Sequence, residues 1–146
     1  MDGYYKNHEA TSSAIDEDGW LHTGDLGIID SEGYLFIKGR SKNMILGPSG
    51  QNIYPEEIED RLNALPYVSE SLVIEKDGKL IALIYPDYEV VKKEKISPEQ
   101  LKTKMDENRK LLNHMLPMYS QVARLKIQET EFEKTPKRSI KRYLYQ

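Results

Sequence analysis

Cysteine is absent from the 146-residue chain, so neither a disulfide framework nor thiol chemistry is possible. Long apolar runs are absent as well, because no stretch approaches the roughly 20 residues that a membrane-spanning helix needs. The first residues also lack the apolar core of a signal peptide. We therefore expect no transmembrane segment, and the lack of cysteine fits a cytoplasmic location.

Neither sign of charge is in large excess, since the formal net charge at pH 7 is -3 although 31% of the residues are charged. This balance gives no global electrostatic reason to expect a nucleic-acid partner or binding to a membrane surface. The three histidines, His8, His22 and His114, lie far apart and have neither cysteine neighbours nor an HExxH context. We therefore predict no metal site.

Short apolar runs separated by turn residues predict an α+β fold. Strands are expected over 26–30, 34–38, 44–46, 68–75, 79–85 and 122–128. Helices are expected over 55–65, 97–116 and 139–145. The Asp77-Gly78 pair is a strong hairpin signal between two of these strands. This mixture favours a small, mainly antiparallel sheet with packed helices, preceded by a separate β-hairpin.

The most specific feature of the sequence is an ordered run of three glycine-punctuated blocks between residues 19 and 59. The blocks read GWLHTGDLGIID, GYLFIKGRSKN and MILGPSGQNIYPEEIE. Their order and spacing resemble the region where the two domains of an adenylate-forming acyl-CoA synthetase meet, with wording typical of long-chain fatty acid:CoA ligases. The resemblance implies that residues 1–40 are the tail of a large N-terminal domain and that residues 41–146 are a mobile C-terminal α+β domain.

The same resemblance implies an AMP-forming ligase, which activates a fatty acid with ATP to acyl-adenylate and then forms acyl-CoA with release of AMP. ATP/AMP and coenzyme A would be the cofactors, and Mg²⁺ would bind with ATP, mainly on the missing large domain. The partners would be the fatty acid, ATP, coenzyme A and the N-terminal domain of the same polypeptide. Because the nucleotide loop of that large domain is missing here, we expect the isolated chain to be inactive.

Four residues of the blocks have ligand-binding roles by this resemblance. A carboxylate can accept hydrogen bonds from two adjacent hydroxyls, and the residue matching Asp25 grips the ribose of ATP in the family. A guanidinium can fork onto phosphate or ribose oxygens, which suits Arg40 to the same ligand. Gly50, with Gln51 beside it, would line the tunnel for the pantetheine arm of coenzyme A. Read alone, Thr23-Gly24-Asp25 would be only a turn before a strand.

Lys42 matches the hinge about which the small domain of the family rotates between two working orientations. A hinge needs weakly packed backbone, and residues 39–43 contain no apolar side chain. By composition alone, a plain linker would look the same.

The basic segment near the C-terminus is the basis of the catalytic prediction. The family places its catalytic lysine in a pattern close to TPxxKIKR, where the charge stabilises the transition state of adenylation. Matching TPKRSIKR to that pattern puts Ser139 at the lysine position, and serine carries no charge. Lys137 or Lys141 would take the role, and Lys137 is favoured if the segment is extended. Without the resemblance, this basic run would be an ordinary solvated face.

Two other functions stay open at this point. Ser139 at the lysine position favours a non-catalytic module that binds a nucleotide or a carrier protein. An acyl ligase that transfers its acyl group to the pantetheine of a carrier protein would use the same small-domain surface.

Overall fold

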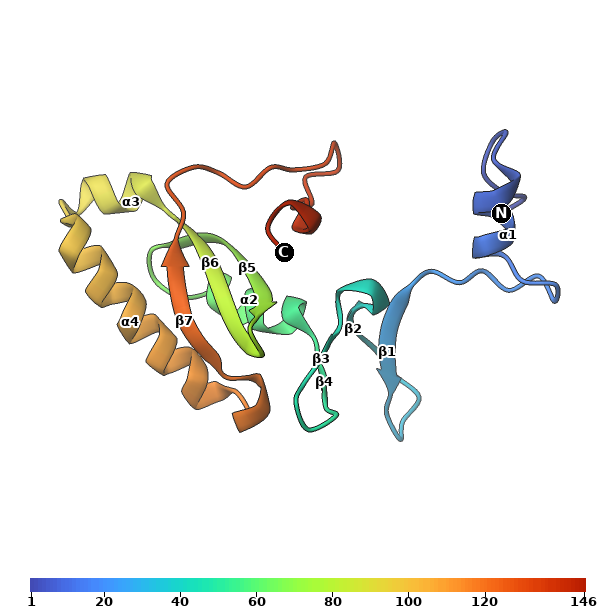
Figure 1. Cartoon of the computed structure of the whole chain (residues 1–146), viewed down its shortest axis with the longest axis horizontal. Coiled ribbons are helices and arrows are strands. Elements are labelled where there is room, and N and C mark those ends of the chain that lie inside the picture. The colour runs from blue at the N-terminus through green and yellow to red at the C-terminus, as the bar shows by residue number, and fades with distance from the viewer. The chain divides into compact units, whose positions relative to one another are not determined.

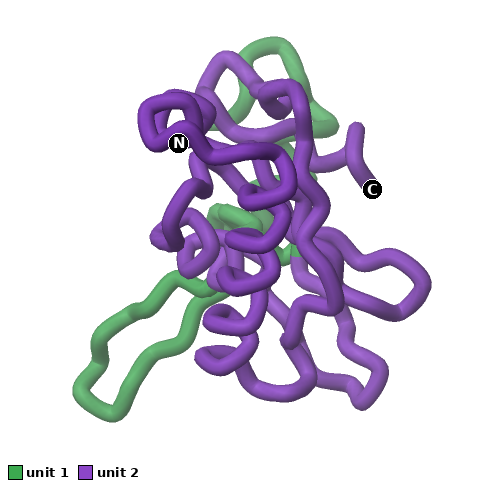
Figure 2. Tube along the Cα trace, turned by 90° about the vertical axis from the view of Figure 1, so that its left-hand side faces the viewer, with its two compact units in different colours: residues 1–43 green, residues 44–146 purple.

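The computed structural model describes all residues, 1–146, and divides them into two compact units, Met1–Asn43 and Met44–Gln146 (Figure 2). We call them unit 1 and unit 2. The boundary between the units lies between Asn43 and Met44. No helix in either unit combines the length and the apolar character that a membrane crossing would require.

Unit 1 contains a short helix, a hairpin and one turn of 3-10 helix. These are α1 (His8–Ala14), β1 (Asp25–Ile29), β2 (Leu35–Arg40) and η1 (Ser41–Asn43). β1 and β2 pair antiparallel, as the sequence predicted for the first hairpin. The helix α1 was not predicted, because it buries no residue and therefore has no apolar stripe for a sequence pattern to detect.

Unit 2 holds the main sheet and most of the helices. Its elements are β3 (Ile45–Leu46), β4 (Asn52–Ile53), α2 (Pro55–Asn63), β5 (Val68–Lys76), β6 (Lys79–Pro86), α3 (Tyr88–Lys93), α4 (Pro98–Met115), η2 (Met118–Ser120), β7 (Val122–Ile127) and η3 (Arg142–Leu144) (Figure 1). The sheet has the strand order β5-β6-β7, with an antiparallel and then a parallel pairing. β3 and β4 form a small antiparallel pair of their own. The predicted α+β class is confirmed.

Local sequence explains where several of these elements begin and end. Asp77 and Gly78 have φ angles of +53° and +70°, the left-handed conformations that a type I′ turn between β5 and β6 requires. Ser97 and Gln100 form the predicted capping box at the start of α4, with Pro98 in the first turn. The short helix α3, which was not predicted, begins at the N-cap Asp87 directly after β6.

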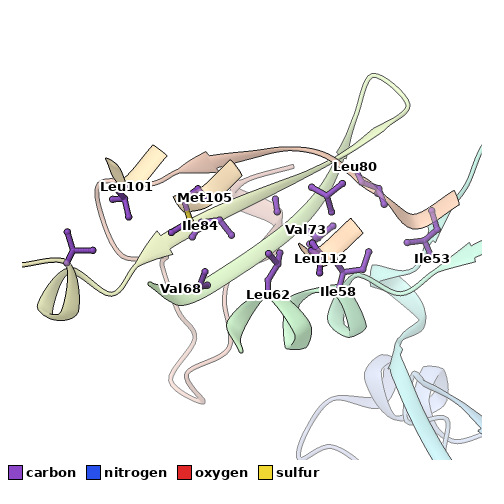
Figure 3. Packing of buried hydrophobic residues seen from close by; sticks show 13 residues of the cluster. Ile53, Ile58, Leu62, Val68, Val73, Leu80, Ile84, Leu101, Met105 and Leu112 are labelled. Atoms are coloured by element: carbon purple, nitrogen blue, oxygen red, sulfur yellow. The ribbon is translucent and has the colours of Figure 1, made fainter. Parts of the chain in front are cut away.

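The sheet is buried on both faces, and the larger hydrophobic cluster lies on the face covered by α2 and α4. Val73 and Ile84 of the sheet pack in this cluster with Ile58 and Leu62 of α2 and with Leu112 of α4 (Figure 3). Since side chains alternate along a strand, the neighbours of Val73 must face the other way. The strands are therefore apolar on both sides, which explains their nearly continuous apolar sequence.

The opposite face is covered by the end of the chain. Leu72 and Leu83 of the sheet pack there against Phe132 and Ile140, and the rings of Phe132 and Tyr145 meet edge to face at 5.2 Å between centroids. The predicted helix over 139–145 is wrong apart from the single 3-10 turn of η3. Ile140 lies instead in a backbone bridge, because its side chain is needed in the cluster on this face.

Candidate functional site

Asp25 and Arg40 are brought together at one end of the hairpin in unit 1. They are directly opposite each other in the β1–β2 register. Arg40 Nη1 donates to Asp25 Oδ1 at 2.7 Å, and the two side chains remain 48% and 34% exposed. The hydrogen bond from Arg40 holds the pKa of Asp25 below its ordinary value, so this carboxyl is ionised at neutral pH.

This exposed pair keeps hydrogen-bonding capacity for a ligand. A carboxylate offers about four lone-pair sites and a guanidinium five N–H donors, far more than the bond between them uses. Gly24 precedes Asp25 with φ of +75°, and a β-carbon added to it would meet only ordinary van der Waals contacts. The glycine is therefore favoured by backbone conformation and not by crowding.

Lys42 lies in η1, at the end of unit 1. Its side chain is exposed, and the helix turn that holds it contains no buried residue. The boundary between the compact units follows at Asn43.

Gly50 and Gln51 lie in the loop that joins β3 to β4. The loop is closed by two backbone hydrogen bonds, from Gly50 N to Gly47 O at 2.9 Å and from Gly47 N to Gln51 O at 2.8 Å. Gly50 has φ of +83° and no atom within 4 Å of an added β-carbon, so it faces open space. Gln51 Oε1, in contrast, is buried and accepts no hydrogen bond, which is costly for a polar atom.

A groove of about 490 Å³ lies beside this loop. Its lining combines Leu46 and Ile53 of the β3–β4 pair with Leu80 of β6 and with Met118 and Tyr119 of η2. Met118 is 88% exposed and Leu46 is 66% exposed, so two large apolar side chains border the groove, together with polar Lys79 and Gln121. This loop and groove suit a slender ligand that is partly apolar.

The basic segment of the C-terminus folds back on itself at Pro136–Arg138. Arg138 N donates to Thr135 O at 2.8 Å, and Thr135 N donates to Ser139 O at 2.8 Å. Arg138 has φ of +62°, in the left-handed region that usually favours glycine. Lys137 therefore lies exposed on a turn, and the extended backbone that favoured it over Lys141 is not present between 137 and 139.

After this turn the chain pairs with residues 133–135, up to Lys141, where φ of -76° and ψ of 78° turn the backbone toward η3. Ile140 bridges Lys134, and Lys141 N donates to Glu133 O at 2.8 Å, which completes a short antiparallel ladder. Since side chains alternate along such a ladder, Ser139 and Lys141 share the side opposite Ile140. Lys141 Nζ lies 3.2 Å from Glu133 Oε2.

Glu59 and Arg142 form an ion pair that the sequence did not single out. It joins α2 to η3, and the two side chains are only 11% and 14% exposed. Burial raises the pKa of Glu59, and Arg142 opposes this shift. Arg142 was counted only as one charge of the basic run, because partners 83 residues apart leave no local pattern.

Comparison with known proteins assigns the chain to a family. Residues 42–145 match the model of the AMP-binding enzyme C-terminal domain. The chain is 39% identical over 120 residues to a putative acyl-CoA synthetase, YngI, from Bacillus subtilis, which covers 82% of this chain and 21% of that protein. It is 49% identical over 85 residues to the long-chain-fatty-acid–CoA ligase FadD13 from Mycobacterium tuberculosis, covering 56% of this chain and 16% of the relative. The chain thus spans about a fifth or less of these relatives.

Solved structures agree with the sequence matches. The o-succinylbenzoate CoA synthetase MenE from Bacillus subtilis, in complex with the acyl-adenylate intermediate OSB-AMP, has a TM-score of 0.71 at 27% identity. That match covers 100% of this chain and 28% of the MenE chain. The adenylation domain of a carboxylate reductase from Mycobacterium chelonae has a TM-score of 0.84 at 23% identity, over 97% of this chain and 24% of that one, and shows the fold alone. The family match, the relatives and the fold lead to one conclusion, that this chain belongs to the AMP-binding enzyme C-terminal domain family.

Proposed function

We propose that this chain is the C-terminal part of a long-chain fatty acid:CoA ligase. The longer polypeptide would activate a fatty acid with ATP to acyl-adenylate and then form acyl-CoA with release of AMP. The observation that carries the proposal is the sequence identity to a long-chain-fatty-acid–CoA ligase within a chain of the matching family. The isolated chain would be inactive and cytoplasmic, with a large N-terminal domain as its partner in the same polypeptide.

Asp25 and Arg40 would hold the nucleotide. The exposed carboxylate of Asp25 would accept hydrogen bonds from the ribose hydroxyls, and Arg40 has N–H groups left for ribose or phosphate oxygens. Mg²⁺ would be bound with ATP by the large domain.

Gly50 and Gln51 would contact the pantetheine arm of coenzyme A. The open space at Gly50 allows a ligand to approach the backbone closely, and the partly apolar groove beside the loop suits a slender chain. The Gln51 side chain would have to turn out of its buried position before its unpaired Oε1 could accept an amide N–H of pantetheine.

Lys141 or Lys137 would supply the positive charge for adenylation that Ser139 lacks. The ladder supports Lys141, because its side chain leaves the backbone on the same side as that of Ser139. Lys137 lies exposed on a turn, so its side chain would carry the charge without a fixed direction toward the substrate.

Lys42 would be the hinge. Its exposed position in η1, beside the boundary of the compact units, supports a backbone that can rotate without breaking a core. The residues before the hinge would be the tail of the large domain. The apolar side chains of β1 and β2 are exposed here, which is the expected state of a surface that another part of the protein would cover.

The proposal is tested by fatty-acid-dependent pyrophosphate release from the full-length polypeptide, with this chain alone as the control and coenzyme A added second. We expect release from the full-length protein only, followed by thioester. Lys141→Met should lower release more than Lys137→Met, and Ser139→Lys should restore release to the Lys141→Met variant. A wild-type protein that releases no pyrophosphate with any fatty acid would contradict the proposal.

A second candidate function is a module that binds nucleotide or a carrier protein without catalysis, which the uncharged Ser139 favours. It predicts nucleotide binding without pyrophosphate release. A ligase that acylates a carrier protein would instead release pyrophosphate, and would form thioester only when carrier-protein pantetheine replaces free coenzyme A.

A further inference from the structure

At the free edge of β5, two charged side chains bond to the backbone of the strand and to each other, outside the proposed ligand sites. β5 pairs with β6 alone, so its other edge has N–H and C=O groups without a strand partner. At Val73, which is 1% exposed, both groups are nevertheless satisfied by side chains. Glu59 Oε1 accepts from Val73 N at 2.6 Å, and Arg142 Nη1 donates to Val73 O at 3.3 Å.

The two side chains reach this edge from opposite faces of the sheet. Glu59 belongs to α2, which covers the face of the larger cluster, and Arg142 belongs to the C-terminal segment, which covers the other face. Arg142 Nη2 bonds directly to Glu59 Oε2, so the pair closes around the strand edge. Together they join the layers on both sides of the sheet.

We propose that the Glu59–Arg142 pair positions the turn at Pro136–Arg138, and Lys141 after it, for the adenylation step. This inference rests on the proposed function. Arg142 directly follows Lys141 and lies three positions after Ser139, so any shift of the anchor moves the residues expected to supply the charge. A misplacement of about 1 Å can lower the rate of a positioned reaction about 100-fold.

The pair stabilises the C-terminal segment in its packed position, because separating Glu59 from Arg142 would leave a buried charge without its partner. If the C-terminal segment lifted, Glu59 would be left as a buried carboxylate without its cation, and Val73 O would lose its donor. Lysine cannot replace the arginine, since a single ammonium cannot span both Glu59 and Val73 O as the planar fork does. The segment has other ties, namely the Lys134–Glu70 ion pair, the Phe132–Tyr145 contact and the packing of Ile140. Arg142 differs from them because it bonds to both α2 and β5, at the position directly after Lys141.

Asn113 offers a matched control for the test. Its amide likewise grips both backbone groups of one strand residue, since Nδ2 donates to Val122 O at 2.9 Å and Oδ1 accepts from Val122 N at 2.8 Å. This tie joins α4 to β7 and does not involve the C-terminal segment. Asn113→Ala therefore measures what the loss of a similar structural tie does to the whole unit.

The experiment compares Arg142→Met, Arg142→Lys and Asn113→Ala in the full-length protein. In both arginine variants we expect kcat for pyrophosphate release to fall about 100-fold while KM for ATP changes less than about threefold. Thioester formation from supplied acyl-adenylate and coenzyme A should change less than about threefold. Amide hydrogen exchange should become at least about tenfold faster over residues 132–142 but not over residues 80–84. Asn113→Ala should lower the thermal midpoint and leave kcat and the exchange of 132–142 unchanged.

Equal losses in both half-reactions, or the same fall in kcat for Asn113→Ala as for Arg142→Met, would overturn the inference and leave the pair a structural tie only. If the wild-type protein releases no pyrophosphate, the proposed function fails and with it the catalytic part of the inference. The exchange measurement then decides the anchor separately. Faster exchange confined to 132–142 supports it, and a uniform increase across unit 2 overturns it.

Discussion

Unit 1 and unit 2 treat their apolar side chains in opposite ways. In unit 2, α2, α4 and the C-terminal segment bury both faces of the sheet. In unit 1 no residue is buried, and the hairpin leaves large apolar side chains between 53% and 68% exposed: Ile28, Ile29, Leu35, Phe36 and Ile37. A two-stranded hairpin is at best marginally stable by itself. Unit 2 therefore carries its own core, whereas the hairpin of unit 1 needs another surface.

The same contrast separates two carboxylate–arginine pairs. Asp25 and Arg40 in unit 1 are roughly half to one-third exposed and keep donors and acceptors for a ligand. Glu59 and Arg142 in unit 2 are buried, and their hydrogen bonds are spent on each other and on Val73. Burial therefore decides whether one pair of residue types can bind a ligand or serves to hold two segments together.

Separating the two units should give the largest effect. We expect residues 44–146 alone to unfold cooperatively on heating, because both hydrophobic clusters are retained. Residues 1–43 alone should show no cooperative transition. Far-UV circular dichroism during thermal melts of the two fragments and the whole chain checks this. A cooperative transition in the short fragment would mean that α1 and the hairpin form a core after all.

Truncation of a core residue should be the next largest effect. Leu112 is fully buried in the larger cluster, so Leu112→Ala should lower the free energy of unfolding by about 3 kcal/mol. Phe36→Ala, in the exposed hairpin of unit 1, should change it by less than about 0.5 kcal/mol. Urea unfolding of the 146-residue variants, followed by circular dichroism, measures both. Similar losses for the two variants would abolish the contrast between the units.

Gly78 and Gly33 provide a matched pair of turn positions for a smaller effect. Their φ angles are +70° and +89°, and a β-carbon added to either meets no atom within 4 Å, so only backbone strain distinguishes alanine from glycine. Gly78→Ala should lower the free energy of unfolding by about 1 kcal/mol. Gly33→Ala should leave the same urea transition unchanged, since its hairpin lies outside the unit that unfolds cooperatively. An equal shift for both variants would show that the two hairpins unfold together.

The main elements of unit 2 could be predicted because their signals are local. Asp77-Gly78 marks a turn, Ser97 and Gln100 mark a helix start, and apolar periodicity marks the strands between them. The C-terminal segment was misjudged for a tertiary reason. Ile140, Tyr143 and Leu144 have helical spacing, yet Ile140 packs on a sheet face whose existence no local pattern reveals.

Some residues of the candidate site could likewise be predicted from local sequence, and others could not. Asp25 and Arg40 were predicted from motifs, and their pairing follows from the hairpin register. The choice between Lys137 and Lys141 depended on backbone conformation, and the turn with Arg138 at positive φ could not be predicted from a residue type that seldom adopts it. Glu59 and Arg142 could not be paired from the sequence, because a contact across a strand edge depends on how three layers pack.

The smallest expected effect concerns the pKa of Asp25 in unit 1. It shows how much of the pKa shift comes from the pairing with Arg40. The hydrogen bond from Arg40 lowers this pKa, so Arg40→Met should raise it toward the ordinary value for an aspartate. Because the folded pKa lies below the unfolded one, the pair stabilises the hairpin fully above the unfolded pKa. That contribution disappears as the pH falls through the folded pKa. Carboxyl ¹³C NMR titration of both proteins measures the shift, and Asp106 in unit 2 is the internal control, because hydrogen bonds from Lys110 and Arg109 lower its pKa independently. An Asp25 pKa that does not move in Arg40→Met would assign the shift to Thr23 and remove Arg40 from the pair.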